Sequence, residues 1–247
     1  HVDHGKSTLA DRLIEISGLI TPGDHVDQIL DTMDLERERG ITIKSQPIRL
    51  NFGNMQINLI DTPGHVDFSY EVSRALIACD GAILLVDGTQ GVQAQTFAHS
   101  YAAIDAGLDI IPVINKVDSI DVDIENVSKQ IFNLIGARDE EIFKISAKSG
   151  LGVDDLIKEI PGLISSPVTK AESTNALIFD SYFDPYRGVI ASVRVFGGEV
   201  KTNSKLKLIN SKFDFEASEI GYFDLKLSPA NLLSSGEVGY IVTGAKE

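Results

Sequence analysis

Two continuous apolar runs, at residues 82–86 and 110–114, are the strongest feature of the hydrophobic pattern. Strands that are apolar at every position are typical of a parallel sheet whose two faces are both covered. Helices are expected beside these runs, at residues 68–78 and 94–106. This alternation of strand and helix predicts a doubly wound α/β domain, with a mainly parallel sheet and helices on both faces.

Further elements are expected on either side of this centre. They are helices at residues 8–16 and 153–160, and strands at 41–52, 55–60 and 143–145. The first helix rests on Leu9, Leu13 and Ile16, which repeat at the three-to-four spacing of a helix. Residues 21–40 are polar and weakly periodic, so we expect mainly a long loop there, with room for short helices. The short Gly53–Asn54 link predicts a hairpin between the two strands that flank it.

The pattern changes after residue 164. Residues 165–174 are polar and contain Pro167, which predicts a linker. Short β-rich stretches follow at 176–182, 189–196, 205–208, 215–220 and 238–242, separated by Gly, Asn, Asp and Ser. This spacing is typical of a small β-barrel. We therefore expect two domains, at residues 1–167 and 174–247.

The first eight residues carry the end of a phosphate loop, G-x-x-x-x-G-K-[ST]. The nucleotide-binding residues expected here are Asp3, His4, Gly5, Lys6, Ser7 and Thr8. Backbone N–H groups of such a loop point at phosphates, and the following helix adds its positive N-terminal end. We expect Lys6 to reach the β- and γ-phosphates and the Ser7 hydroxyl to bind Mg²⁺.

Two further positions are candidates for the same magnesium and phosphate site. Asp61 ends a predicted strand, where a carboxylate is well placed to hold Mg²⁺ through water. Gly64, three residues later, can turn its N–H onto a γ-phosphate, because glycine tolerates unusual backbone angles. Thr42 closes the long polar loop and is a candidate second Mg²⁺ ligand. A loop ordered by one phosphate in this way would act as a switch.

Two motifs that follow predicted strands suit the recognition of a base: Asn115-Lys116-Val117-Asp118 and Ser146-Ala147-Lys148. Asp118 can accept hydrogen bonds from N1–H and the 2-amino group of guanine, a pair of donors that adenine lacks. We expect Asn115 to brace the loops and the Lys116 stem to cover one face of the base. The Ala147 N–H is expected to bond the guanine carbonyl oxygen. Together with the phosphate motifs, these residues predict a GTP site.

The charge balance limits the partners. The formal net charge is −14, and the acidity is concentrated before residue 170, with 13 Lys and Arg against 26 Asp and Glu. Such a surface repels nucleic acid at long range, so we expect no DNA binding. No run of about 18 apolar residues occurs, so no membrane span is expected. The single cysteine, Cys79, suits a reducing cytosol.

The five motifs, in this order, resemble those of the translational GTPases. The sequences of residues 1–6 and of Asp61-Thr62-Pro63-Gly64-His65 are specific to that superfamily. Residues 174–247 resemble its second domain. Residues 33–40, 70–74, 91–96 and 178–184 look most like the elongation factor 4 (LepA) family. The resemblance covers the whole chain. It implies a P-loop GTPase domain followed by a small translation-factor-type β-barrel.

The resemblance implies a function in protein synthesis. Members of the family are ribosome-dependent GTPases, and are described as promoting back-translocation of tRNAs. The expected partners are the ribosome, through its RNA and proteins, and GTP or GDP; we expect a monomer. The resemblance also implies a cytoplasmic protein with peripheral association with the cytoplasmic face of the cell membrane. The chain starts one residue inside the phosphate loop, so we expect an N-terminal fragment of a longer protein, with the first strand missing. Because that strand would be central, we expect a polypeptide starting at His1 to fold poorly.

The resemblance also assigns the chemistry. His65, one residue after Gly64, is expected to orient the water that attacks the γ-phosphorus. Val2 and Ile41 resemble the apolar gate that keeps this histidine away until the ribosome acts. Asp3 is expected to bind a monovalent cation or to orient His65.

Four other assignments stay open. The BipA family is close, but its usual sequence in the second strand and in the barrel differs from that of this chain. Elongation factor G carries a large insertion where this chain has only residues 119–145. A tRNA-carrying factor of the Tu type fits residues 35–40 less well. The fourth alternative is a nucleotide-dependent binding module without useful turnover.

Overall fold

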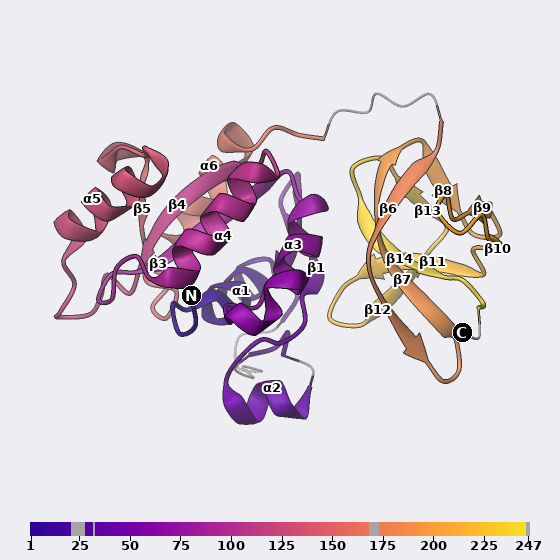
Figure 1. Cartoon of the computed structure of the whole chain (residues 1–247), viewed down its shortest axis with the longest axis horizontal. Coiled ribbons are helices and arrows are strands. Elements are labelled where there is room, and N and C mark those ends of the chain that lie inside the picture. The colour runs from indigo at the N-terminus through magenta and orange to yellow at the C-terminus, as the bar shows by residue number, and fades with distance from the viewer. Residues whose placement is uncertain (21–27, 32, 168–172, 246–247) are drawn as a thin grey trace. The chain divides into compact units, whose positions relative to one another are not determined.

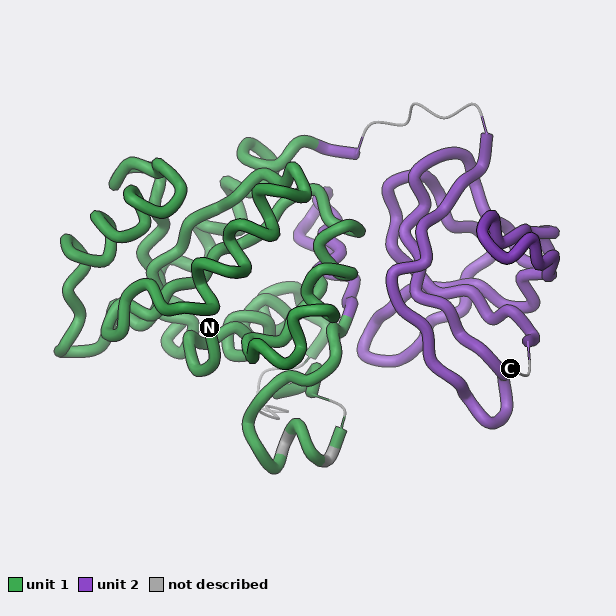
Figure 2. Tube along the Cα trace, viewed as in Figure 1, with its two compact units in different colours: residues 1–46, 60–165 green, residues 47–59, 166–247 purple. Residues whose placement is uncertain are grey.

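The computed structural model describes residues 1–20, 28–31, 33–167 and 173–245. Parts of the expected polar loop and of the expected linker lie outside these residues. The chain forms two compact units: unit 1 holds residues 1–46 and 60–165, and unit 2 holds residues 47–59 and 166–247 (Figure 2). The predicted boundaries, 1–167 and 174–247, place residues 47–59 in the first part instead, and they remain a prediction about the natural domains.

Unit 1 is built on a parallel sheet of three strands (Figure 1). These are β3 (Gly81–Asp87), β4 (Asp109–Asn115) and β5 (Phe143–Lys144), in the order β3-β4-β5. In β3 and β4 the register pairs Ala82 with Ile110 and Asp87 with Asn115. The two apolar runs therefore lie side by side, and the polar residues that end them meet at one edge of the sheet.

Helices cover both faces of this sheet, as predicted. They are α1 (Lys6–Ile16), α2 (Asp34–Arg39), α3 (Ser69–Ile77), α4 (Ala94–Asp105), α5 (Ile124–Ile135) and α6 (Val153–Leu163), with short 3-10 turns at Val66–Phe68 and Asp139–Glu141. Leu84 and Val86 pack against α5, and Ala82 on the same face packs against α3 and α4. Leu85, Ile111 and Val113 point to the opposite face and are also buried. Helices α1 and α6 also bury apolar positions, among them Leu13 and Leu156. No helix of the described residues is long and apolar enough to cross a membrane.

Helix α5 was not predicted, although its sequence carries the signal. Val127, Ile131 and Leu134 are buried at helical spacing and contact the sheet. The Asp123 carboxylate accepts a hydrogen bond from the Asn126 N–H at 3.0 Å, which caps the start of the helix. Gly136, with φ 76°, ends it.

The predicted hairpin is present, but its first strand is shorter than expected. Strand β1 spans Gln46–Phe52 and pairs with β2, Met55–Asp61, in a sheet of its own. The expected start at residue 41 is wrong because the Glu36 carboxylate accepts the backbone N–H groups of Ile43 and Lys44, at 2.9 and 3.0 Å. Those two donors are thereby taken by a side chain instead of by a neighbouring strand.

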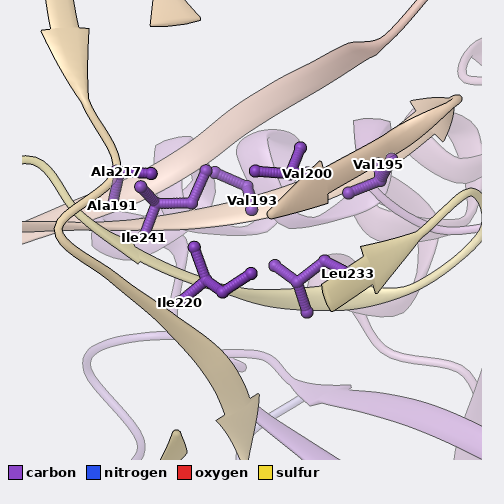
Figure 3. Close-up of a cluster of buried hydrophobic side chains, with 8 residues drawn as sticks. All are labelled: Ala191, Val193, Val195, Val200, Ala217, Ile220, Leu233 and Ile241. Atoms are coloured by element: carbon purple, nitrogen blue, oxygen red, sulfur yellow. The ribbon is translucent and has the colours of Figure 1, made fainter. Parts of the chain in front are cut away.

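Within unit 2, the strands after residue 173 pair antiparallel. They are β6 (Asn175–Asp184), β7 (Gly188–Gly197), β8 (Glu199–Lys201), β9 (Lys205–Lys207), β10 (Asp214–Glu216), β11 (Glu219–Phe223), β12 (Leu227–Ala230), β13 (Leu232–Ser234) and β14 (Val238–Val242). The main sheet has the order β12-β11-β14-β7-β6, and β8 pairs with β13 and β9 with β10. One buried cluster of unit 2 is entirely aliphatic: Ala191, Val193, Val195, Val200, Ala217, Ile220, Leu233 and Ile241 (Figure 3). The hairpin residue Arg49 lies over the Tyr222 ring, 3.8 Å from its centre, within the same unit.

Candidate nucleotide site

Three oxygen-bearing side chains from distant parts of the chain converge at the start of α1. The Ser7 hydroxyl lies 3.2 Å from the Thr42 hydroxyl and donates to Asp61 Oδ2 at 3.4 Å. These are the three predicted Mg²⁺ ligands. Burial raises the pKa of Asp61 to about 6, against the opposing effect of Lys6. An all-oxygen set with one carboxylate and two hydroxyls fits Mg²⁺, which keeps several waters and takes few protein ligands.

Lys6 lies beside this group, and Gly64 lies against Lys6. The Lys6 ammonium donates to the His1 carbonyl at 2.7 Å. Burial lowers the pKa of Lys6, while Asp61 and Asp3 act in the opposite direction. A side chain at Gly64 would overlap the Lys6 ammonium and approach the His1 carbonyl oxygen to 2.9 Å. Position 64 therefore accepts only glycine without rearrangement of the loop.

A pocket that is open to solvent lies over these residues. It is lined by Val2, Asp3, Gly5, Lys6, Ser7, Thr8, Gln28, Gly40, Ile41, Thr42, Gly64 and His65. The pocket thus brings together most of the predicted phosphate and metal residues, the predicted catalytic histidine and the two residues of the expected apolar gate. All of these lining residues belong to unit 1.

The His65 ring is held by its neighbours Asp67 and Phe68. Its Nδ1 accepts a hydrogen bond from the Asp67 N–H at 3.2 Å, and the ring packs at 5.8 Å from that of Phe68. With Nδ1 as an acceptor, the neutral ring carries its proton on Nε2. In this arrangement the free edge of His65 is a hydrogen-bond donor, which suits orienting a water better than removing its proton.

Asn115 joins the phosphate loop to the second base motif. Its amide nitrogen donates to the His4 carbonyl and its amide oxygen accepts from the Ala147 N–H, both at 2.9 Å. The Ala147 N–H, which is expected to bond guanine, therefore already donates to Asn115. A guanine carbonyl oxygen would have to share this N–H with the Asn115 amide oxygen. At Gly5, with φ 91°, a side chain would collide with the Asn115 amide.

Lys116 is held by a residue that the sequence analysis missed. The Lys116 ammonium contacts Asp87 Oδ2 and the Asp3 carbonyl, each at 2.7 Å. Asp87 is fully buried. Burial tends to raise its pKa, but hydrogen bonds from Lys116 and Thr89 outweigh burial and hold the pKa below its usual range. In the sequence Asp87 directly follows the apolar run at residues 82–86, but only the register of the sheet places it beside Asn115.

The remaining predicted residues lie within the phosphate loop or in and beside the loop of Ser146–Lys148, called the base loop below. Asp118 is exposed, and a hydrogen bond from Ser146 is the main cause that lowers its pKa. The Lys148 carbonyl accepts from Arg12 Nη2 at 2.6 Å. The His4 ring is buried, with Nδ1 3.2 Å from the Asp87 N and 3.3 Å from the Leu85 carbonyl. Its side chain thus anchors the phosphate loop to β3.

The phosphate loop, the oxygen cluster and the base loop at one end of a parallel sheet define a phosphate-loop nucleotide-binding domain. Comparison with known families makes the class specific. The chain belongs to the family described as the elongation factor Tu GTP binding domain, whose model matches residues 1–166.

The most similar relatives include proteins named elongation factor 4. That of Pelodictyon phaeoclathratiforme is 52% identical over 254 residues, and those of Rubrobacter xylanophilus and Aquifex aeolicus are each 49% identical. Each match covers 100% of this chain but 42% of the relative. The chain therefore spans less than half the length of the relatives it matches.

A solved structure supports the fold. The crystal structure of a bacterial selenocysteine-specific elongation factor, EF-Sec, matches with a TM-score of 0.80 and 24% identity. The match covers 99% of this chain and 41% of that one. At this identity the likeness concerns the fold alone.

Proposed function

We propose that this chain is the nucleotide-binding part of a ribosome-dependent GTPase of translation that binds and hydrolyses GTP with Mg²⁺. The observation that carries the proposal is the convergence of Thr42 and Asp61 on the Ser7 hydroxyl, at 3.2 and 3.4 Å. Ser7 and Thr42 line a pocket together with Lys6 and His65. Because the relatives are named elongation factor 4, we favour a factor of that kind over a BipA-type or elongation factor G-like factor. In this role the protein promotes back-translocation of tRNAs on the ribosome.

The residues divide the work in a way that fits phosphoryl transfer. Lys6 and the N–H groups at the start of α1 neutralise the phosphates, and Gly64, which lies against the Lys6 ammonium, adds its own N–H. Mg²⁺, when bound, neutralises charge on the phosphate oxygens and would be held by Ser7 and Thr42, with Asp61 acting through water. His65 orients the attacking water through Nε2–H. Catalysis of this kind is mainly positioning and electrostatic stabilisation.

The remaining assignments concern the recognition of guanine, the role of Asp3 and the location of the protein in the cell. Asp118 reads N1–H and the 2-amino group, Lys116 covers the base, and Ala147 within Ser146–Lys148 meets the carbonyl oxygen. Asp3 binds a monovalent cation or orients His65. The protein works as a cytoplasmic monomer, and associates peripherally with the cytoplasmic face of the membrane.

Single-turnover hydrolysis of GTP, measured with and without ribosomes, tests the proposal. A stimulated rate is expected in the presence of ribosomes. A nucleotide-dependent binding module, the second candidate, would bind GTP in the same assay and show no stimulated turnover. Binding of aminoacyl-tRNA in the presence of GTP would favour a factor of the Tu type instead.

A further inference from the structure

Arg12 connects the helix of the phosphate loop to the loop that meets the base. It lies on α1, six residues after Lys6 and therefore about 9 Å further along the helix axis. Its Nε donates to the Ala147 carbonyl at 3.2 Å and its Nη2 donates to the Lys148 carbonyl at 2.6 Å. One side chain thus holds two successive carbonyl groups of the Ser146–Lys148 motif.

The guanidinium is fixed on its other side as well. Its Nη1 contacts the Glu15 carboxylate one turn along α1, and the two side chains are 23% and 22% exposed. The base loop lies directly over it, because a side chain at Gly150 would come within 3.7 Å of Arg12 Nε. A planar group with a fixed fork of donors suits this double contact, and the single point charge of lysine does not.

The contacts have a directional consequence for the base loop. In a trans peptide the C=O and the following N–H point in opposite directions. Because Arg12 holds the Ala147 carbonyl, the Lys148 N–H points away from α1. On the other side, Asn115 Oδ1 accepts the Ala147 N–H at 2.9 Å. The loop is therefore clamped between α1 and the Asn115 motif, with its N–H groups turned away from Arg12.

We propose that Arg12 is a specificity-determining positioning residue, which presents the N–H groups of Ala147 and Lys148 to the carbonyl oxygen at position 6 of guanine. This inference rests on the proposed GTP site. It assigns the reading of the 6-carbonyl to the Arg12-held loop, and leaves the reading of N1–H and the 2-amino group to Asp118. Removal of Arg12 should therefore weaken one half of base recognition and spare the other.

Two modified nucleotides separate these halves. In 6-thio-GDP the oxygen at position 6 is replaced by sulfur, a weak acceptor. IDP keeps that oxygen and lacks the 2-amino group. The wild-type protein is expected to prefer GDP over both. In Arg12→Ala we expect GDP to bind roughly tenfold more weakly. The loop loses the contacts that position it, and we take the cost to be about that of one charge-assisted hydrogen bond. The GDP to 6-thio-GDP affinity ratio should fall towards one, and the GDP to IDP ratio should stay unchanged.

The experiment measures equilibrium affinities of the intact protein for the three nucleotides, in wild type, Arg12→Ala, Arg12→Lys and the control Arg138→Ala. Arg138 is an exposed arginine of the same unit, paired with Glu140 and Glu141. Arg12→Lys keeps the charge and the helix, and should lose the 6-thio-GDP discrimination as Arg12→Ala does. An unchanged GDP to 6-thio-GDP ratio in both Arg12 variants would overturn the inference, even if their melting temperatures fall. A wild-type protein that does not prefer GDP over IDP would instead overturn the proposed GTP site.

Discussion

At the scale of single residues, the site depends on buried carboxylates that organise backbone and lysine donors. Asp87 accepts from Lys116, Thr89 and Gln90, and Glu36 accepts three backbone N–H groups. Buried charges of this kind are costly unless they are fully paired. Removing one therefore leaves several donors without a partner at once.

Asp87→Asn is expected to weaken nucleotide binding. The substitution keeps the shape and removes the charge that holds Lys116 in contact with the Asp3 carbonyl. The loss of a charge-assisted hydrogen bond, about 1.5–3 kcal/mol, corresponds to a GDP affinity roughly ten- to a hundredfold lower. Titration with a fluorescent GDP analogue measures the change.

The control for this substitution is Asp155→Asn, because Asp155 is exposed and pairs only at the surface with Lys158. Surface pairs contribute little, so its affinity should match wild type. An Asp87→Asn protein that is folded and binds GDP as the control does would show that the Lys116 contact is dispensable.

At the scale of elements, the central strands and the nucleotide motifs could be predicted from the sequence, because local patterns specify them. The runs at residues 82–86 and 110–114 are β3 and β4, and the motifs that follow the strands do meet at one end of the sheet. What local patterns do not contain is tertiary pairing. Arg12, Glu36 and Asp87 have ordinary neighbours in sequence, and only the fold brings each to its partners. Helix α5 differs from these three residues, because the apolar spacing of Val127, Ile131 and Leu134 is a local pattern that is sufficient to predict a helix.

The loop that carries Thr42 depends on Glu36, and Glu36→Gln is expected to loosen it. The carboxylate accepts from Met33, Ile43 and Lys44, at 2.9 to 3.0 Å, and an amide offers only one oxygen to these donors. Thr42 should then be held less firmly beside Ser7. We expect the preference for GTP over GDP to fall several-fold with little change in GDP affinity, measured by competition binding with Mg²⁺ present.

Glu38→Gln is the matched control, because Glu38 lies on the same short helix and is exposed. It should leave both affinities at the wild-type values. If Glu36→Gln also leaves the GTP to GDP ratio at the wild-type value, Glu36 does not position Thr42.

At the scale of the whole molecule, the pH dependence of stability should report the buried phosphate-loop histidine. Burial, with help from the charges of His1 and Lys6, lowers the pKa of His4 to about 4, from 6.5. Between these two values the unfolded chain binds more protons than the folded one, so stability rises with pH. The contribution of His4 is complete above pH 6.5 and is lost as the pH falls towards 4. Denaturant unfolding from pH 7.5 to 4.5 should show this slope, and His4→Gln should flatten it. The same slope in His4→Gln as in wild type would contradict the buried neutral ring.

The acidic surface limits how the protein can bind ribosomes, and the greater length of the relatives limits what this chain can do by itself. A net charge of −14 disfavours general binding to nucleic acid, so association with ribosomes has to rest on local contacts. The chain covers 42% of its elongation factor 4 relatives, and the activity proposed for it is that of the whole protein.

The measurement that tests the central claim most directly is ribosome-stimulated GTP hydrolysis by wild type and His65→Ala, with GTP affinity determined for both. The His65 ring lines the pocket without bonding to Lys6, Ser7 or Asp61 among the contacts described here. The account therefore predicts that His65→Ala binds GTP with nearly wild-type affinity and loses the stimulated turnover. Stimulated hydrolysis at the wild-type rate in His65→Ala would contradict it.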